Sequence, residues 1–169
     1  MGNEVNAGQS LSNDINVITA EINAYQRVAG EAIFEIGRRL HDVKYNPKKF
    51  GLPVGTDKEG REIVARGSWG DFLASVNMEE TYARKFEIIF VEIGSNRATL
   101  HDKGMSALYE IAQIPIEHRE QPHTIPSTGE TKTVDEMTVR ELREVKDRVS
   151  DGIHLRGVKP DTRTILLSF

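Results

Sequence analysis

Residues 67–90 read GSWGDFLASVNMEETYARKFEIIF, and this stretch decides the expected fold. The spacing predicts a first helix over 69–76 with Ser68 as its N-cap, which buries Trp69, Phe72 and Leu73. Asn77 is expected to end that helix and to cap a second one. The apolar positions of the second helix recur at helical spacing and predict a buried face made of Tyr82, Ala83, Phe86, Ile89, Phe90 and Ile93. Two short helices around a tight turn are typical of a helix-turn-helix unit.

The other face of the second helix carries the candidate DNA contacts. Thr81, Arg84 and Lys85 are placed to touch base edges or phosphate. A different interpretation is a buried pair of core helices, because residues 88–93, IIFVEI, are apolar on nearly every side. Glu79, Glu80 and Glu87 would also meet phosphate unfavourably, although acids near a helix start suit the helix dipole.

A long helix is predicted before this unit, from a cap at 12–14 to about Lys44, ahead of the breaker at 46–47. Its apolar stripe alternates spacings of three and four residues. The stripe is Ile15, Ile18, Ile22, Tyr25, Ala29, Ala32/Ile33, Ile36, Leu40 and Val43. The pattern fits a core-facing helix or a dimerisation arm equally, so a homodimer through residues 15–43 is one expectation.

Two short β-hairpins are predicted elsewhere, one within 45–67 around DKEG and one within 123–137 around Pro126–Gly129. Thr138 and Glu141 form a capping box that opens another helix, expected to reach about Val149. The expected fold class is therefore mainly α, with a long N-terminal helix, a helix-turn-helix-like core and one or two hairpins.

The chain is expected to comprise four regions. These are a disordered N-terminus at 1–11, the helical core at 12–104, a C-terminal helical region at 105–149 and a tail at 150–169. The formal net charge is −4, but residues 36–66 carry eight Lys and Arg against four Asp and Glu. Lys48 and Lys49 lie in this basic segment and are candidate contacts to a DNA backbone, although a charge run is more commonly a solvated loop.

Catalytic chemistry finds no support in the sequence. There is no cysteine, the five histidines are scattered without a paired helical spacing, and phosphate-loop and nucleophile-elbow motifs are absent. We therefore expect no enzyme activity, no metal and no cofactor. The start lacks the order of a signal peptide and no apolar run reaches the ~18 residues of a membrane span, which predicts a soluble, cytoplasmic protein without a membrane partner.

Four motifs resemble an uncharacterised family encoded by bacteriophages and other mobile elements of Gram-positive bacteria. They are I-G-x-x-L at 36–40, G-x-W-x-x-[FW]-L at 67–73, T-x-A-x-[KR]-[FY] at 81–86 and VDEMTVRELREVK at 134–146. The resemblance covers most of residues 12–149. It implies a phage or mobile-element protein with a helix-turn-helix and a regulatory role.

Two functions follow as expectations. The first is a regulator that binds DNA and controls transcription. The second is a protein-binding antirepressor, or an inhibitor of a host or anti-phage defence protein. The second is motivated by the acidic segment at 105–137 and by an apolar end that would bind a partner through Ile165, Leu166, Leu167 and Phe169.

Overall fold

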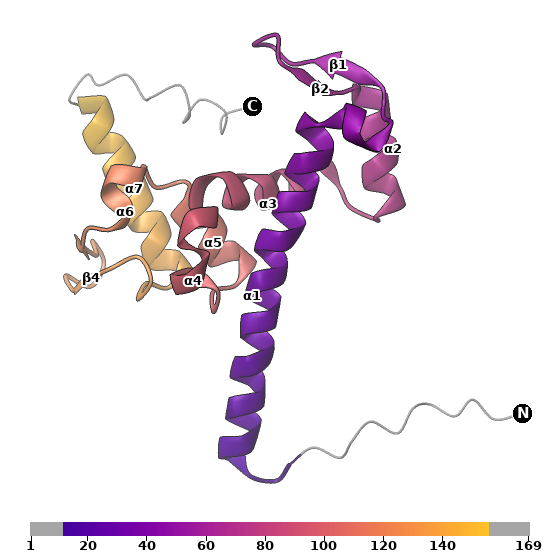
Figure 1. Ribbon diagram of the computed structural model, residues 1–169. Coiled ribbons are helices and arrows are strands. Elements are labelled where there is room, and N and C mark those ends of the chain that lie inside the picture. Colours follow the sequence, from indigo (N-terminus) through magenta and orange to yellow (C-terminus); the bar gives the residue numbers. More distant parts are fainter. Residues whose placement is uncertain (1–11, 156–169) are drawn as a thin grey trace, which may run out of the picture.

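The computed structural model describes residues 12–155 and is mainly helical, with a long N-terminal helix and two small antiparallel sheets, which confirms the expected fold class (Figure 1). The main helices are α1 (Ile15–Tyr45), α2 (Arg66–Ser75), α3 (Glu80–Ile93), α5 (Met105–Ala112) and α7 (Val139–Leu155). Shorter helices are η1 (Pro47–Phe50), η2 (Gly94–Asn96), α4 (Arg97–Leu100) and α6 (Ile116–Arg119). The strands are β1 (Val54–Thr56), β2 (Glu62–Val64), β3 (His123–Thr124) and β4 (Thr131–Lys132).

Helix α1 begins where the sequence predicted. The carboxylate of Asp14 accepts a hydrogen bond of 2.8 Å from the backbone N–H of Asn16, which satisfies an otherwise unpaired donor of the first turn. Within its second half, two glycines let the backbone of α1 approach its neighbours. A methyl group at Gly37 would stand 2.3 Å from the carbonyl oxygen of Phe86, and one at Gly30 would stand 1.7 Å from that of His101. These two contacts fix α1 tightly against α3 and the turn after α4.

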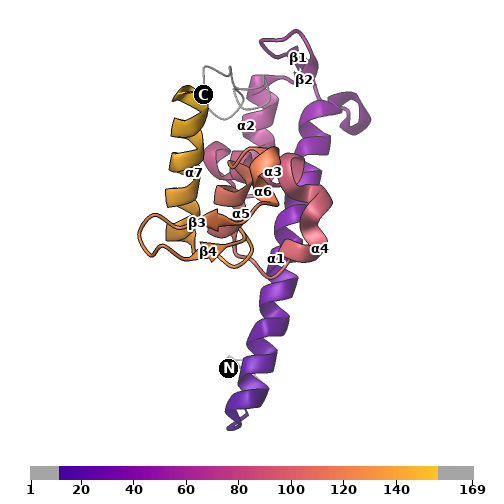
Figure 2. The same cartoon turned by 90° about the vertical axis from the view of Figure 1, so that its left-hand side faces the viewer.

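The first half of α1 has no such support. In both views it extends away from the other elements as a single rod (Figures 1 and 2). Ile15 and Tyr25 are each 73% exposed and Ile22 is 51% exposed, whereas Leu40 and Val43 are buried. The predicted stripe is therefore core-facing only in its second half, and no other element within residues 12–155 covers residues 15–29.

One apolar core joins the two helical regions. Phe34 of α1 and Ile89 and Ile93 of α3 pack in the same cluster as residues of α5 and α7. The contributions of α5 and α7 are Leu108, Ile111, Leu142 and Val145, all nearly inaccessible to solvent. This core continues across residue 104, so the regions 12–104 and 105–149 are held together by it. A second cluster lies between α1, α2 and α3.

The turn between α2 and α3 differs from the prediction. Helix α2 begins at Arg66, so Ser68 lies inside it and is not its N-cap; strand β2 leads directly into the helix, with Ala65 at the cap. Asn77 adopts a left-handed backbone (φ 52°) and caps nothing in α3, whose N-cap is Glu79. The N–H of Met78 instead donates to the carbonyl of Leu73 at 2.9 Å, and that of Asn77 donates to Ala74 at 3.1 Å. This pair of bonds is a Schellman motif, which asparagine favours because it tolerates the left-handed region.

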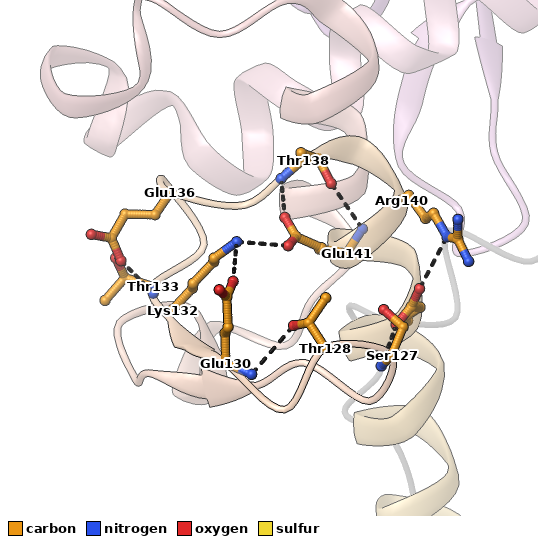
Figure 3. A network of polar contacts seen from close by, with 10 residues as sticks. Ser127, Thr128, Glu130, Lys132, Thr133, Glu136, Thr138, Arg140 and Glu141 are labelled. Carbon is orange, nitrogen blue, oxygen red and sulfur yellow. Dashed lines mark hydrogen bonds and ion pairs between the residues drawn. The ribbon is translucent and has the colours of Figure 1, made fainter.

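The capping box at the start of α7 is formed as predicted. The N–H of Thr138 donates to the Glu141 carboxylate at 2.7 Å, and the N–H of Glu141 donates to the Thr138 hydroxyl at 3.3 Å (Figure 3). Lys132 of β4 donates to the same carboxylate at 2.8 Å, which ties the β3–β4 hairpin to the helix. Both predicted hairpins are present, and α7 continues to Leu155 rather than ending near Val149.

Two predictions fall outside the described residues. These are the disordered N-terminus at 1–11 and the partner-binding residues Ile165, Leu166, Leu167 and Phe169. None of the described helices combines the length and the apolar character needed to cross a membrane.

Candidate nucleic-acid interface

The α2–α3 unit rests on the second half of α1. Trp69 and Leu73 of α2 and Ala83 and Phe86 of α3 are all buried, and they pack in one cluster that includes Leu40 and Val43 of α1. Because both helices of the unit share this support, the turn between them and the beginning of α3 are held in a fixed orientation.

Helix α3 is more accessible in its first half than in its second, although Ala83 and Phe86 of the first half are buried and Val91 of the second half is 57% exposed. Thr81 and Lys85 are exposed and Arg84 is half-buried. One turn later Ile88 packs against the main core, and Ile89 and Ile93 are fully buried. Burial of Ile89 and Ile93 thus explains most of the apolar run at 88–93, of which Val91 remains exposed. The candidate contacts Thr81, Arg84 and Lys85 all lie in the first half of the helix.

Aromatic rings border these side chains. The Lys85 ammonium lies 5.4 Å from the centre of the Tyr109 ring of α5, close enough for a cation–π contact. Tyr82 was expected in the buried face but is 47% exposed, and it packs edge-on against Phe86 with ring centres 5.0 Å apart. A shallow surface hollow follows the turn, lined by Asn77, Met78, Glu79, Thr81, Tyr82 and Lys85. Backbone, hydroxyl, aromatic and cationic groups are therefore presented side by side.

Glu79, Glu80 and Glu87, the three acids expected to repel phosphate, do not act alike. Glu79 and Glu80 are exposed at the start of the helix, where negative charge suits the helix dipole. Glu87 is turned inward and 7% exposed, with its carboxylate 2.8 Å from the Lys44 ammonium of α1. Burial raises the pKa of Glu87, and the nearby Lys44 opposes that rise. One of the three charges expected to repel a phosphate is therefore withdrawn from the surface.

The structure places Lys48 and Lys49 away from the residues of α3. Both lie in η1, before the hairpin that leads into the N-terminal end of α2, whereas Thr81 follows the turn at its C-terminal end (Figure 1). A ten-residue helix is about 15 Å long, so the two groups are separated by roughly that distance along α2. The Lys48 ammonium contacts Glu62 at 2.6 Å, and Lys49 pairs with Asp42. Exposed pairs of this kind are weak, roughly 0–1 kcal/mol, so a phosphate could still compete for either lysine.

A buried arginine was missed by sequence reasoning. The Arg119 guanidinium is 8% exposed and donates to the backbone carbonyls of Ile114 and Glu92, each at 2.6 Å, and of Ala112 at 2.8 Å. It also donates to the Glu92 carboxylate at 2.9 Å. The guanidinium thereby satisfies backbone carbonyl groups at the C-terminal ends of α3 and α5, so the role of Arg119 is structural. No local pattern marks it, because its partners come from other helices.

Metal binding gains no support from the described part of the chain. No group of three or more His, Asp or Glu side chains within residues 12–155 is arranged to hold an ion. His118 and His123 have ring centres 6.4 Å apart, but the Nε2 atom of His123 is engaged with the His118 carbonyl oxygen at 2.7 Å.

Comparisons with protein-family models, with curated proteins and with solved structures found no match to this chain.

Proposed function

We propose that this protein binds double-stranded DNA through the first half of α3, as a regulator of transcription encoded by a phage or mobile element. The carrying observation is that the more accessible first half of α3 presents Thr81, Arg84 and Lys85 while Ile89 and Ile93 of its second half anchor the helix in the core. In helix-turn-helix proteins the N-terminal residues of the second helix contact base edges in the major groove. The sequence resemblance to phage proteins favours a regulatory role in the cytoplasm of a bacterial host.

The side chains of this surface suit the proposed contact. Arginine recognises guanine through two parallel hydrogen bonds, lysine binds guanine or phosphate, and the threonine hydroxyl pairs with either kind of base edge. The exposed ring of Tyr82 adds an apolar group that can pack against a thymine methyl. Glu79 and Glu80 restrict how DNA can approach the helix. Their carboxylates repel phosphates, so the DNA backbone must pass on the side of Lys85.

A double substitution tests the proposal. Sites are first selected from a library of host and phage DNA fragments with the full chain, and affinity for the recovered site is then measured by fluorescence anisotropy. Arg84→Ala with Lys85→Ala should weaken binding by about tenfold or more, since each lost base contact costs roughly 1–3 kcal/mol. The salt dependence should also become shallower, because each phosphate contact contributes a slope of about −0.9.

A matched control separates this effect from a general loss of positive charge. Arg140→Ala with Arg148→Ala removes the same two charges from exposed positions on α7, which belongs to another part of the structure. Affinity should change little in this variant. Equal losses in the two double variants, with unchanged circular dichroism, would contradict a specific role for α3.

The rival function is that of a protein-binding antirepressor or inhibitor. One observation favours it: the cations Lys48, Lys49 and Arg61 of the basic segment are paired with carboxylates, which reduces the positive field that attracts DNA. An apolar protein interface loses little affinity as salt rises, whereas phosphate contacts give a steep loss. Salt titration of the isolated complex therefore distinguishes the two functions.

A further inference from the structure

Residues 15–32 of α1, here called the arm, present an apolar stripe that nothing in the described chain covers. Ile15, Ile22 and Tyr25 are more than half exposed, and Ala29 and Ala32 are exposed as well. From Ile33 onward the same stripe turns into the core, where Leu40 and Val43 are buried. The stripe is thus one continuous apolar face, and only its second part packs against the core.

The arm is also a poor helix on its own. Its N-terminal part, INVITAEI at 15–22, is rich in β-branched residues, which lower helix stability when nothing packs against them. In proteins, most of the stability of a helix comes from packing of its apolar face rather than from helix propensity. A helix that extends in this way therefore needs a surface to pack against.

We propose that the arm pairs with the arm of a second copy of this chain, antiparallel, to form a homodimer. The large residues of the stripe lie at its start and the small ones at its end. Antiparallel pairing sets Ile15 against Ala32, Ile18 against Ala29 and Ile22 against Tyr25 of the second copy, so that large residues face small ones at both ends. Parallel pairing would set alanine on alanine at 29 and 32 and leave the interface underfilled.

The position of the remaining helices selects the same orientation. Because the core covers the stripe from Ile33 onward, a parallel second helix would run into the space that the core occupies. An antiparallel helix overlaps only the arm. The overlap of residues 15–32 is about 27 Å long, or about five helical turns, along which the apolar stripes of the two arms are removed from water.

Charge is compatible with self-association. Glu21, Arg27 and Glu31 are the only charged residues of the arm, and none of them belongs to the stripe. Two identical arms can therefore meet without placing like charges at the centre of the contact. A strongly acidic or basic partner would find no complementary charge here.

Light scattering during gel filtration tests the dimer without DNA, so its outcome is independent of the proposed function. The full chain should elute with twice its mass of 19.0 kDa and dissociate on dilution. Ile22→Glu should give a monomer with unchanged unfolding of the core. The control Val17→Glu adds the same charge to an exposed apolar position outside the stripe and should remain dimeric. A monomeric wild type, or a dimer that survives Ile22→Glu, would overturn the proposal.

Cross-linking tests the relative orientation of the two arms. The chain contains no cysteine, so every disulfide must come from the introduced residues. Ile18→Cys and Ala29→Cys are prepared separately and then mixed and oxidised. Antiparallel arms give a disulfide between the two variants and none within either variant alone. Disulfides formed by Ile18→Cys alone would show parallel arms and overturn the antiparallel assignment. If the dimer also binds DNA as proposed, its site should contain two half-sites related by two-fold symmetry.

Discussion

Replacing Gly37 by alanine should separate the energetics of helix propensity from those of the α1–α3 contact. In an open helical position this substitution stabilises a protein by about 0.5–1 kcal/mol. At Gly37, however, the new methyl group would lie 2.3 Å from the Phe86 carbonyl oxygen and 2.8 Å from the Phe90 Cβ atom. Both neighbours are backbone or near-backbone atoms of a helix, so the contact can be relieved only by moving α1 and α3 apart by about an ångström. Overpacking of this kind typically costs about 1–3 kcal/mol, or more when backbone must move.

The expected net effect of Gly37→Ala is a loss of about 1–3 kcal/mol in the free energy of unfolding, measured by denaturant titration with circular dichroism. Gly70→Ala provides the matched control, since Gly70 lies within α2 and no atom stands within 4 Å of an added methyl group. That control should gain about 0.5–1 kcal/mol. If both variants were stabilised equally, the close approach of α1 and α3 would be refuted.

Three further changes test the polar contacts, each by denaturant titration. Arg119→Lys should cost about 3–5 kcal/mol, because an ammonium group cannot serve the carbonyls that the buried guanidinium joins. Lys44→Met should cost about 2–4 kcal/mol at neutral pH by leaving Glu87 buried and unpaired, and part of this loss should return as the pH falls and Glu87 becomes protonated. The Lys132 and Thr138 contacts lower the pKa of Glu141 to about 2, so their stabilisation should be lost as the pH falls from 4.5 toward that value, and Glu141→Gln should flatten this dependence.

Local signals predicted the elements and those ends that a nearby side chain caps. The cap at Asp14, the capping box at Thr138 and both hairpins depend on side chains within a few residues of each other, and each is present in the structure. Local chemistry also explains where prediction was wrong. Asn77 can either cap the following helix or end the preceding one in the left-handed conformation. The hydrogen bond from the Met78 N–H to the Leu73 carbonyl accompanies the left-handed conformation, which is the one observed.

Long-range packing accounts for what the sequence could not show. The stripe of α1 is regular from Ile15 to Val43, and nothing in its period indicates that the core stops near residue 30. The inward turn of Glu87 depends on Lys44, which is 43 residues away. Lys48 and Lys49 were grouped with the α3 residues by charge alone, and the intervening helix α2 separates them.

The measurement that tests DNA binding through α3 most directly is recovery of the tagged full chain from its bacterial host, with and without nuclease, followed by sequencing of bound DNA and identification of bound proteins. The wild-type chain should recover one discrete DNA site, and this site should be lost with Arg84→Ala and Lys85→Ala together. Recovery of a stoichiometric host protein that is insensitive to nuclease, with no discrete DNA site, would contradict it.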